Sequence, residues 1–365
     1  MEQKRLLCIV SSLDAGGAET FMMKIFRNLP AAYKMDFIVS TDMGYHEDEV
    51  CMLGGQIHRV SLRTKHPIKS FFEIRNIVKH NHYNFVLKLC DTPIGVFDLL
   101  AARAGGAKKL CVRSCNASSS ENKVKHIIFA VLRPILNLVA DVKLAPSVLA
   151  AEYTFGKAEV EADRVKFLHN ALDTDCFRFS ETERKRIRKE FQIADGQMII
   201  GHIGRFSQQK NHAFLLDIFK EYNKRHNQSV LLLVGNGELE KFIKAKASEL
   251  GISDKIIFTG VRSDIPALLS AMDVFVFPSL YEGMPNTVIE AQATGLPCVI
   301  ADTITREADI TGLVHYLPLG DAGEWADFIK HMQPVVRKTQ TQRFIENGYD
   351  INTVTEQFVK LIFQE

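Results

Sequence analysis

The clearest chemical cluster in the sequence is a short stretch in which two carboxylates flank a tight turn. Glu282 and Glu290 lie at its ends, and Gly283-Met284-Pro285 follows the first of them. The stretch comes after an apolar run over 273–277, which we expect to be a strand, and it opens a predicted helix. Loops between the carboxyl end of a parallel strand and a helix bind ligands in α/β sheets. Outward N–H groups and the positive helix end there suit a phosphate or a sugar hydroxyl, and carboxylates accept hydrogen bonds from sugar hydroxyls.

Glu290 has a second interpretation. The run from Thr287 to Glu290 fits a capping box, in which the Glu side chain returns to a backbone N–H at the helix start. That interpretation leaves Glu282 and the turn unexplained. Both remain open for Glu290.

A second cluster contains two cations, Arg205 and Lys210, within the run from Gly204 to Asn211. It follows an expected strand over 198–203 and precedes an expected helix over 212–222. Two cations on such a loop can converge on a diphosphate and neutralise the charge on a departing nucleoside diphosphate, as a metal does elsewhere. The alternative is a pair of solvated surface charges.

Two further loops carry weaker signals. Gly16 and Gly17 follow the first apolar run and allow a close approach of the backbone to an anion, but the three-glycine dinucleotide fingerprint is missing, which disfavours NAD. At Val261 and Arg262, backbone groups could read a base edge and the guanidinium could stack on it. Each loop could equally be a plain turn.

The elements that would position these loops follow from the hydrophobic pattern. Short apolar runs alternate with amphipathic helical segments, which predicts α/β domains with parallel sheets covered by helices on both faces. A chain of 365 residues is long enough for two domains. We expect a first domain over 1–175, a second over 176–348, and a C-terminal helical segment over 349–365. The expected strands are 6–10, 36–40, 85–89, 109–112, 142–145, 198–203, 230–234, 255–258, 274–277 and 297–300.

The composition narrows the range of possible functions. With 45 Lys and Arg against 43 Asp and Glu, the chain is nearly neutral and has no overall positive electrostatic field that would favour binding to nucleic acid. Seven scattered Cys suggest buried thiols in a reduced cytosol.

Neither a signal peptide nor a membrane span is expected. Residues 122–139 are basic and apolar, and they predict either a helix at a membrane surface or an ordinary core helix.

Metal binding is not expected. The triplet from Asp173 to Asp175 matches the DxD pattern of another sugar-transferase architecture. It lies in the predicted connection between the domains, however, and does not follow a nucleotide-binding half-fold.

Taken together, four motifs resemble the GT4-type retaining glycosyltransferases of the GT-B fold, in particular the bacterial capsular and exopolysaccharide branch. They are Gly-Gly-Ala-Glu at 16–19, Gly-Arg-x4-Lys-Asn at 204–211, Phe-x-Gly-Val-x-x-Asp at 258–264 and Glu-x7-Glu at 282–290. The resemblance spans most of the chain. It implies two facing Rossmann-like domains, an N-terminal one for the acceptor and a C-terminal one for the nucleotide-sugar donor. It also implies that the C-terminal helix packs back on the first domain.

The resemblance also implies roles for individual residues. Arg205 and Lys210 would bind the donor diphosphate, Glu282 would approach the donor sugar, and Glu290 would hold the ribose. We take Arg205, Lys210 and Glu282 as the catalytic candidates. The donor-binding candidates are Gly16, Gly17, Asn116, Gly204, Val261, Arg262, Met284, Pro285, Asn286, Thr287 and Glu290.

One departure concerns the loop expected to face the donor sugar. Family members often have a His-Ser-His-Asn-like stretch there, and this chain has Arg113-Ser114-Cys115-Asn116. A thiol does not replace a neutral imidazole. Either Ser114 or Asn116 takes that contact, or the correspondence is shifted, or catalysis is weakened.

The resulting expectation is a metal-independent, cofactor-free enzyme. It would move a sugar with retention from a UDP-sugar to a glycan, such as an undecaprenyl-diphosphate-linked sugar, in capsular or exopolysaccharide synthesis. It would be cytoplasmic, peripheral on the inner face of a bacterial membrane, and would bind no nucleic acid. The alternatives are a nucleotide-sugar epimerase or hydrolase of the same fold, or a catalytically weakened nucleotide-sugar binding module.

Overall fold

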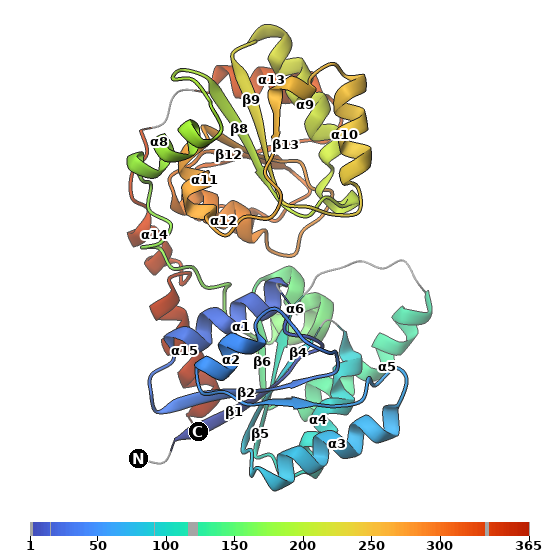
Figure 1. Ribbon diagram of the computed structural model, residues 1–365. Coiled ribbons are helices and arrows are strands. Elements are labelled where there is room, and N and C mark those ends of the chain that lie inside the picture. The colour runs from blue at the N-terminus through green and yellow to red at the C-terminus, as the bar shows by residue number, and fades with distance from the viewer. Residues whose placement is uncertain (1–2, 15, 91, 116–122, 333–335, 365) are drawn as a thin grey trace. The chain divides into compact units, whose positions relative to one another are not determined.

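The computed structural model describes residues 3–14, 16–90, 92–115, 123–332 and 336–364, with the backbone alone over 123–127. The chain forms two compact units (Figure 1). The first consists of Met1–Leu172 together with Gly348–Glu365, and the second of Asp173–Asn347. These divisions lie within a few residues of the expected ones.

The first unit contains a parallel sheet of seven strands in the order β3-β2-β1-β4-β5-β6-β7. Its order reverses between β1 and β4, as in Rossmann-like folds. The register places Leu6 opposite Met35 on one side and Phe85 on the other. The strands are β1 (Lys4–Ile9), β2 (Tyr33–Val39), β3 (Ile57–Arg59), β4 (Phe85–Cys90), β5 (Lys109–Ser114), β6 (Val142–Ala145) and β7 (Lys166–Phe167).

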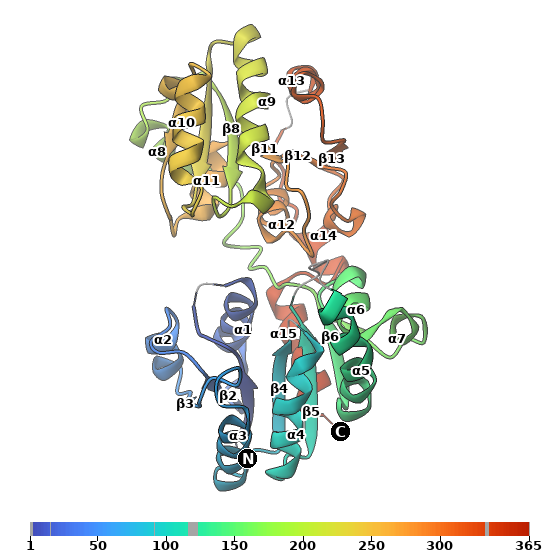
Figure 2. The same cartoon turned by 90° about the vertical axis from the view of Figure 1, so that its right-hand side faces the viewer.

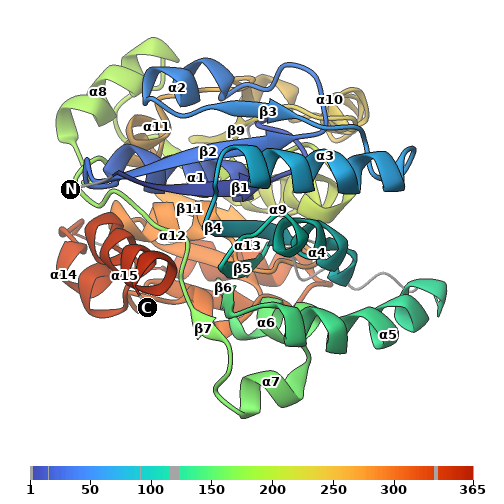
Figure 3. The ribbon, with the colours of Figure 1, turned by 90° about the horizontal axis from the view of Figure 1, so that it is seen from below.

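Helices cover both faces of this sheet, because successive strand residues point to opposite sides. In β1, Leu6 and Cys8 join one hydrophobic core while Leu7 and Ile9 join the other. The first core includes residues of α1 (Gly17–Asn28), α2 (Glu47–Met52) and α15 (Ile351–Phe363). The second includes residues of α3 (Pro67–His80), α4 (Val96–Ala104), α5 (Lys123–Val139) and α6 (Val148–Phe155), beside α7 (Lys157–Glu161). Figure 3 shows α3, α4 and α5 following one another on that side.

The C-terminal helix α15 belongs to the first unit, as the resemblance implies. It lies beside α1 (Figure 1) and buries Val354, Phe358 and Ile362 in the first core. The Asp350 carboxylate caps the helix by accepting a hydrogen bond from the Asn352 N–H at 2.9 Å.

The second unit contains a parallel sheet of six strands in the order β10-β9-β8-β11-β12-β13. Figure 2 shows its helices on both sides of the sheet, with α9 against α10 and α13, and α8 against α11. The strands are β8 (Met198–Ile203), β9 (Ser229–Val234), β10 (Ile256–Phe258), β11 (Val274–Phe277), β12 (Cys298–Ala301) and β13 (Val314–Leu317). The helices are α8 (Glu181–Glu190), α9 (His212–Arg225), α10 (Glu240–Glu249), α11 (Ile265–Ala271), α12 (Asn286–Ala293), α13 (Ala322–His331) and α14 (Thr341–Glu346).

The predicted fold class is confirmed, and each expected strand overlaps a strand of the structure. The strands that the hydrophobic pattern did not predict, β3, β7 and β13, lie at sheet edges, where fewer residues need to be apolar. Among the described residues, every helix is too short or too polar to cross a lipid bilayer.

Candidate active site

The two predicted chemical clusters of the second unit meet in a direct ion pair. The Lys210 Nζ donates a hydrogen bond to the Glu282 Oε1 at 2.7 Å. The two side chains are only 18% and 9% exposed, so solvent screens the pair weakly. Lys210 ends the 3₁₀ turn η2 (Gln208–Lys210) after β8, and Glu282 lies in the loop after β11. Because β8 and β11 are neighbours in the sheet, their carboxyl ends bring these loops together.

Two hydrogen bonds join the two loops beside this pair. The Leu280 N–H donates to the Gln209 carbonyl at 2.8 Å, and the Gln209 side chain donates to the Tyr281 carbonyl at 2.9 Å. The Lys210 ammonium also lies 4.6 Å from the centre of the Phe277 ring, a favourable cation–π distance. The ammonium is therefore held in place before any ligand arrives.

The rest of the Gly204–Asn211 loop is fixed by the neighbouring loop after β9. Phe206 is buried, and its N–H donates to the Asn236 carbonyl at 2.8 Å. A Cβ added at Gly235 would lie 2.2 Å from the Gly204 carbonyl oxygen, so only glycine allows this approach. Arg205, by contrast, is exposed and pairs with Glu238 at 3.1 Å. The loop thus combines a held cation, Lys210, with a solvated one, Arg205.

The capping-box interpretation of Glu290 is wrong. Helix α12 begins at Asn286 and its N-cap position is Pro285, with no side-chain cap. Thr287 is therefore the second helical residue, and Glu290 lies beyond the position from which a capping-box Glu reaches back. Met284, Asn286, Thr287 and Glu290 are partly exposed, whereas Pro285 is buried.

Two histidines are buried beneath this site, and the motifs did not indicate them. The His202 Nδ1 lies 2.8 Å from the Val276 carbonyl oxygen, and its ring centre lies 4.6 Å from that of His212. Burial, together with the smaller effect of the nearby Lys210 charge, lowers the pKa of His212 to about 4. Both imidazoles are consequently neutral at physiological pH and add no positive charge beside Lys210.

The loop after β10 holds its arginine in ion pairs. The Arg262 guanidinium donates to both carboxylate oxygens of Asp264 at 2.8 Å and to Glu190 at 2.7 Å. These bonds hold the pKa of the Asp264 carboxyl well below its usual range. The guanidinium therefore fixes this loop, and stacking of Arg262 on a base stays a prediction. Val261 beside it is exposed.

In the first unit, the candidate loops lie at the carboxyl edge of the sheet. Gly16 is the N-cap residue of α1 and Gly17 its first residue. Ser114 does not take the contact proposed for it, because its buried hydroxyl donates to the Ala150 carbonyl at 2.9 Å and lies 2.7 Å from the Thr154 hydroxyl. Cys115 is partly exposed just after β5. Asn116 lies outside the described residues.

Arg113 has a structural position next to this loop. Its guanidinium is buried, lies 3.8 Å from the Phe21 ring centre and donates to the Asn170 Oδ1 at 2.6 Å. Burial lowers the pKa of Arg113 to about 10, which still leaves it charged at neutral pH. The side chain ties β5 to α1 and is too deeply buried to reach a substrate.

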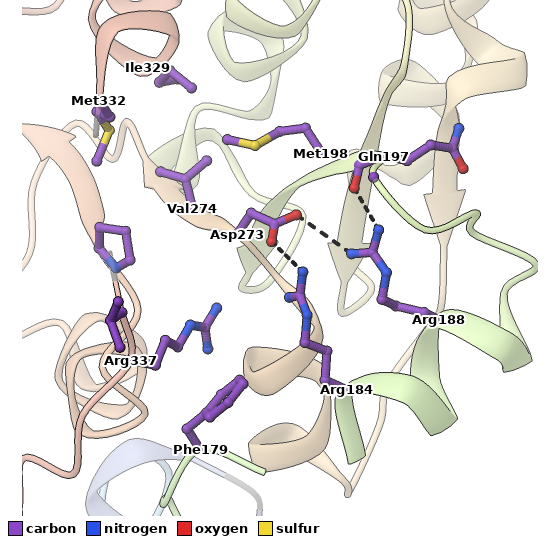
Figure 4. A pocket seen from close by; sticks show the side chains of 13 residues that line it. Phe179, Arg184, Arg188, Gln197, Met198, Asp273, Val274, Ile329, Met332 and Arg337 are labelled. Carbon is purple, nitrogen blue, oxygen red and sulfur yellow. Dashed lines mark hydrogen bonds and ion pairs between the residues drawn. The ribbon is translucent and has the colours of Figure 1, made fainter. Parts of the chain in front are cut away.

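A cavity of about 530 Å³ lies away from the motif loops, at the amino ends of β8, β11 and β12. Figure 4 shows Arg184 and Arg188 directed at the Asp273 carboxylate, at 2.6 and 3.6 Å, with Arg337 nearby. Arg184 and Arg337 also donate to carbonyl groups at the end of α11, which explains their position as helix caps. In the part of the chain that the structure describes, no cluster of His, Cys, Asp and Glu side chains is arranged to hold a metal ion.

Comparisons with known proteins identify the family of the chain. Residues 183–350, which include both motif loops of the second unit, match the family model of group 1 glycosyl transferases. The EpsF protein of Bacillus subtilis, which bears the name of a glycosyltransferase, is 33% identical over 359 residues, covering 95% of this chain and 93% of that protein. The chain belongs to the group 1 glycosyltransferase family.

Two further similarities bear on this glycosyltransferase. An Escherichia coli UDP-Gal:alpha-D-GlcNAc-diphosphoundecaprenol alpha-1,3-galactosyltransferase is 25% identical over 240 residues, covering 64% of this chain and 62% of that protein. The crystal structure of Anabaena HepE in complex with UDP and glucose has a TM-score of 0.77 at 19% identity, covering 98% of this chain and 99% of that one. The second similarity confirms the GT-B fold.

Proposed function

We propose that this glycosyltransferase moves a sugar with retention from a UDP-sugar to a lipid-linked glycan acceptor, in capsular or exopolysaccharide synthesis. The names of the relatives support the donor and the acceptor: one uses UDP-galactose and a diphosphoundecaprenol-linked acceptor, and a structural neighbour binds UDP. The single observation that carries the proposal is the Lys210–Glu282 pair at the carboxyl edge of the second sheet.

In the proposed mechanism, UDP departs from the face on which the acceptor hydroxyl enters. The bond from the anomeric carbon to the phosphate oxygen breaks, the bond to the acceptor oxygen forms, and the acceptor proton passes to the leaving phosphate oxygen. Lys210 and Arg205 stabilise the charge that develops on the diphosphate, while Glu282 positions the sugar. A cation placed before the reaction lowers the barrier because it needs no reorganisation.

No metal or other cofactor takes part in this proposal, since the two cations supply the electrostatic stabilisation. The test follows transfer from a panel of UDP-sugars to a diphosphate-linked sugar acceptor, with and without EDTA, and determines the anomeric configuration of the product by NMR. We expect EDTA-resistant transfer that keeps the donor's configuration. An inverted product, or activity lost with EDTA and restored by a divalent ion, contradicts the mechanism.

The two alternatives give different results in the same assay. A nucleotide-sugar epimerase or hydrolase turns over the UDP-sugar without any acceptor. A weakened binding module, for which Cys115 in place of His is the main support, binds UDP but transfers nothing. We expect turnover that depends on the acceptor.

We also propose that α5 contacts a membrane surface. Ile128, Val131, Ile135 and Leu138 lie along one stripe of this helix and are exposed, Leu138 to 86%. Phe129 and Leu136 on the same helix are buried. An amphipathic helix with an exposed apolar stripe is suited to the headgroup region of a bilayer.

A further inference from the structure

A second cavity, this one in the first unit, lies at the same sheet edge as the Gly16–Gly17 and Cys115 loops. Its volume is about 660 Å³, within the range of about 300–1,000 Å³ typical of ligand pockets. It opens between the amino ends of α3 and α4. Its walls come from the turn that follows β3 and from the turn η1 (Pro93–Gly95) that follows β4.

Large apolar side chains form most of the wall. Ile68 and Phe71 come from α3, and Ile94 and Phe97 from η1 and α4. Ile68 is 73% exposed and Phe97 is 44% exposed, although the opposite side of α3 buries Ile74 and Val78 in the core. A group of exposed apolar side chains around a cavity marks a binding surface, because such exposure is unfavourable in water.

Positive charge borders this apolar wall. The Asp98 carboxylate forms ion pairs with Arg63 at 2.6 Å and with Lys88 at 3.0 Å, so two cations share one buried carboxylate. Lys69 lies on the first turn of α3, which has no acidic residue, so the helix dipole adds to the positive charge. The Glu73 carboxylate lies 3.8 Å from the Lys69 ammonium, and it also accepts a hydrogen bond from the Ser61 N–H at 2.6 Å, so the Lys69 pair is the longer of its two contacts.

We propose that this cavity binds the hydrocarbon chain of the acceptor lipid next to its phosphate groups, with the phosphates beside Arg63 and Lys69. An apolar cavity bordered by cations is complementary to an amphiphile that joins a hydrocarbon chain to an anionic head. A free sugar would require more hydrogen-bonding groups than these walls offer. The inference rests on the proposed function, because it names the site that selects the lipid part of that acceptor.

The test compares two ligands and two variants. Isothermal titration measures the binding of dodecyl diphosphate and methyl diphosphate, each below its micelle concentration, to wild type, Phe97→Gln and Phe72→Gln. Phe72 is the matched control, since it is 51% exposed on α3 but does not line the cavity. Both side chains are exposed, so neither variant is expected to affect folding.

We expect wild type to bind the dodecyl ligand at least about tenfold more tightly, because burial of each methylene is favourable. Phe97→Gln should lose most of this preference and Phe72→Gln should keep it. Equal affinity for both ligands overturns the inference. So does an equal loss in the two variants, which would indicate a general membrane-contact surface.

A transfer assay separates this inference from the proposed function. With long-chain and methyl diphosphate-linked sugar acceptors, Phe97→Gln should raise KM for the long-chain acceptor about tenfold. It should leave kcat/KM for the methyl acceptor and the affinity for UDP unchanged. Binding that depends on the length of the hydrocarbon chain, without any sugar transfer, contradicts the proposed function but leaves the cavity assignment intact. Equal loss with both acceptors overturns the cavity assignment, because it indicates a sugar-binding or structural role for Phe97.

Discussion

The Lys210 Nζ lies 2.7 Å from the Glu282 Oε1, although the two residues are 72 positions apart in the sequence. They meet because each follows a strand, and β8 and β11 are adjacent in a parallel sheet. A buried ion pair is costly to desolvate, and replacing such pairs with apolar residues is often neutral or stabilising. Its position at the ligand-binding edge of the sheet therefore favours a functional explanation over a purely structural one.

Replacing Glu282 should separate sugar recognition from nucleotide recognition. Glu282→Gln keeps the size of the side chain but removes the negative charge that, in our proposal, contacts the donor sugar. We expect KM for the UDP-sugar to rise about tenfold or more, equivalent to about 1.4 kcal/mol, while the Kd for UDP changes far less. Glu238→Gln is the control, because Glu238 pairs with exposed Arg205 in the neighbouring loop. Equal weakening of UDP and UDP-sugar binding would count against a contact with the sugar.

Acid should destabilise the second unit through His212. Its pKa is about 4 in the folded chain against 6.5 for an unperturbed histidine, so the unfolded chain takes up the proton first as pH falls. Stability from the neutral imidazole is complete above pH 6.5 and is lost as pH falls from 6.5 toward 4, by about 3 kcal/mol. Chemical denaturation at several pH values, on wild type and His212→Phe, measures this. The variant should show a shallower pH dependence over that window, and an identical slope would refute the assignment.

The C-terminal helix should stabilise the first unit and have no effect on the stability of the second. Phe358 is fully buried in the core between α15 and α1, so Phe358→Ala should cost about 3–5 kcal/mol. In thermal unfolding, Phe358→Ala should lower the midpoint of the transition that belongs to the first unit, and added UDP should not change that midpoint. UDP binding by the second unit should persist. Glu356→Ala, at an exposed position of the same helix, should have little effect. Loss of UDP binding in Phe358→Ala would contradict the division into units.

The apolar stripe of α5 should govern association with membranes. Val131→Glu and Leu138→Glu place charges at exposed positions, so folding should be retained while binding to anionic vesicles weakens. Met52→Glu, at an exposed position on α2, is the control. Vesicle sedimentation measures the bound fraction. Unchanged binding in both α5 variants would contradict the proposed contact.

The position of the candidate site could largely be predicted from the sequence, because its residues follow strand ends. Arg205, Lys210 and Glu282 could be placed on loops at one sheet edge from hydrophobic patterning alone. The helix start at Asn286 was not predictable, because Thr287 also fitted a capping box. The bonds that bury Ser114 come from Ala150 and Thr154, which are distant in the sequence. The cavity beside Phe97 depends on how α3 packs against α4, and no local pattern encodes that packing.

The role proposed for Lys210 is tested most directly by the transfer rate of Lys210→Ala with a saturating UDP-sugar and acceptor. We expect kcat to fall about 10²–10³-fold, because the cation that would stabilise the leaving diphosphate is lost. Lys224→Ala, which removes an exposed cation on α9, should keep the wild-type rate. Circular dichroism should confirm that both variants are folded. Transfer by folded Lys210→Ala at the wild-type rate would contradict the proposed role of this cation.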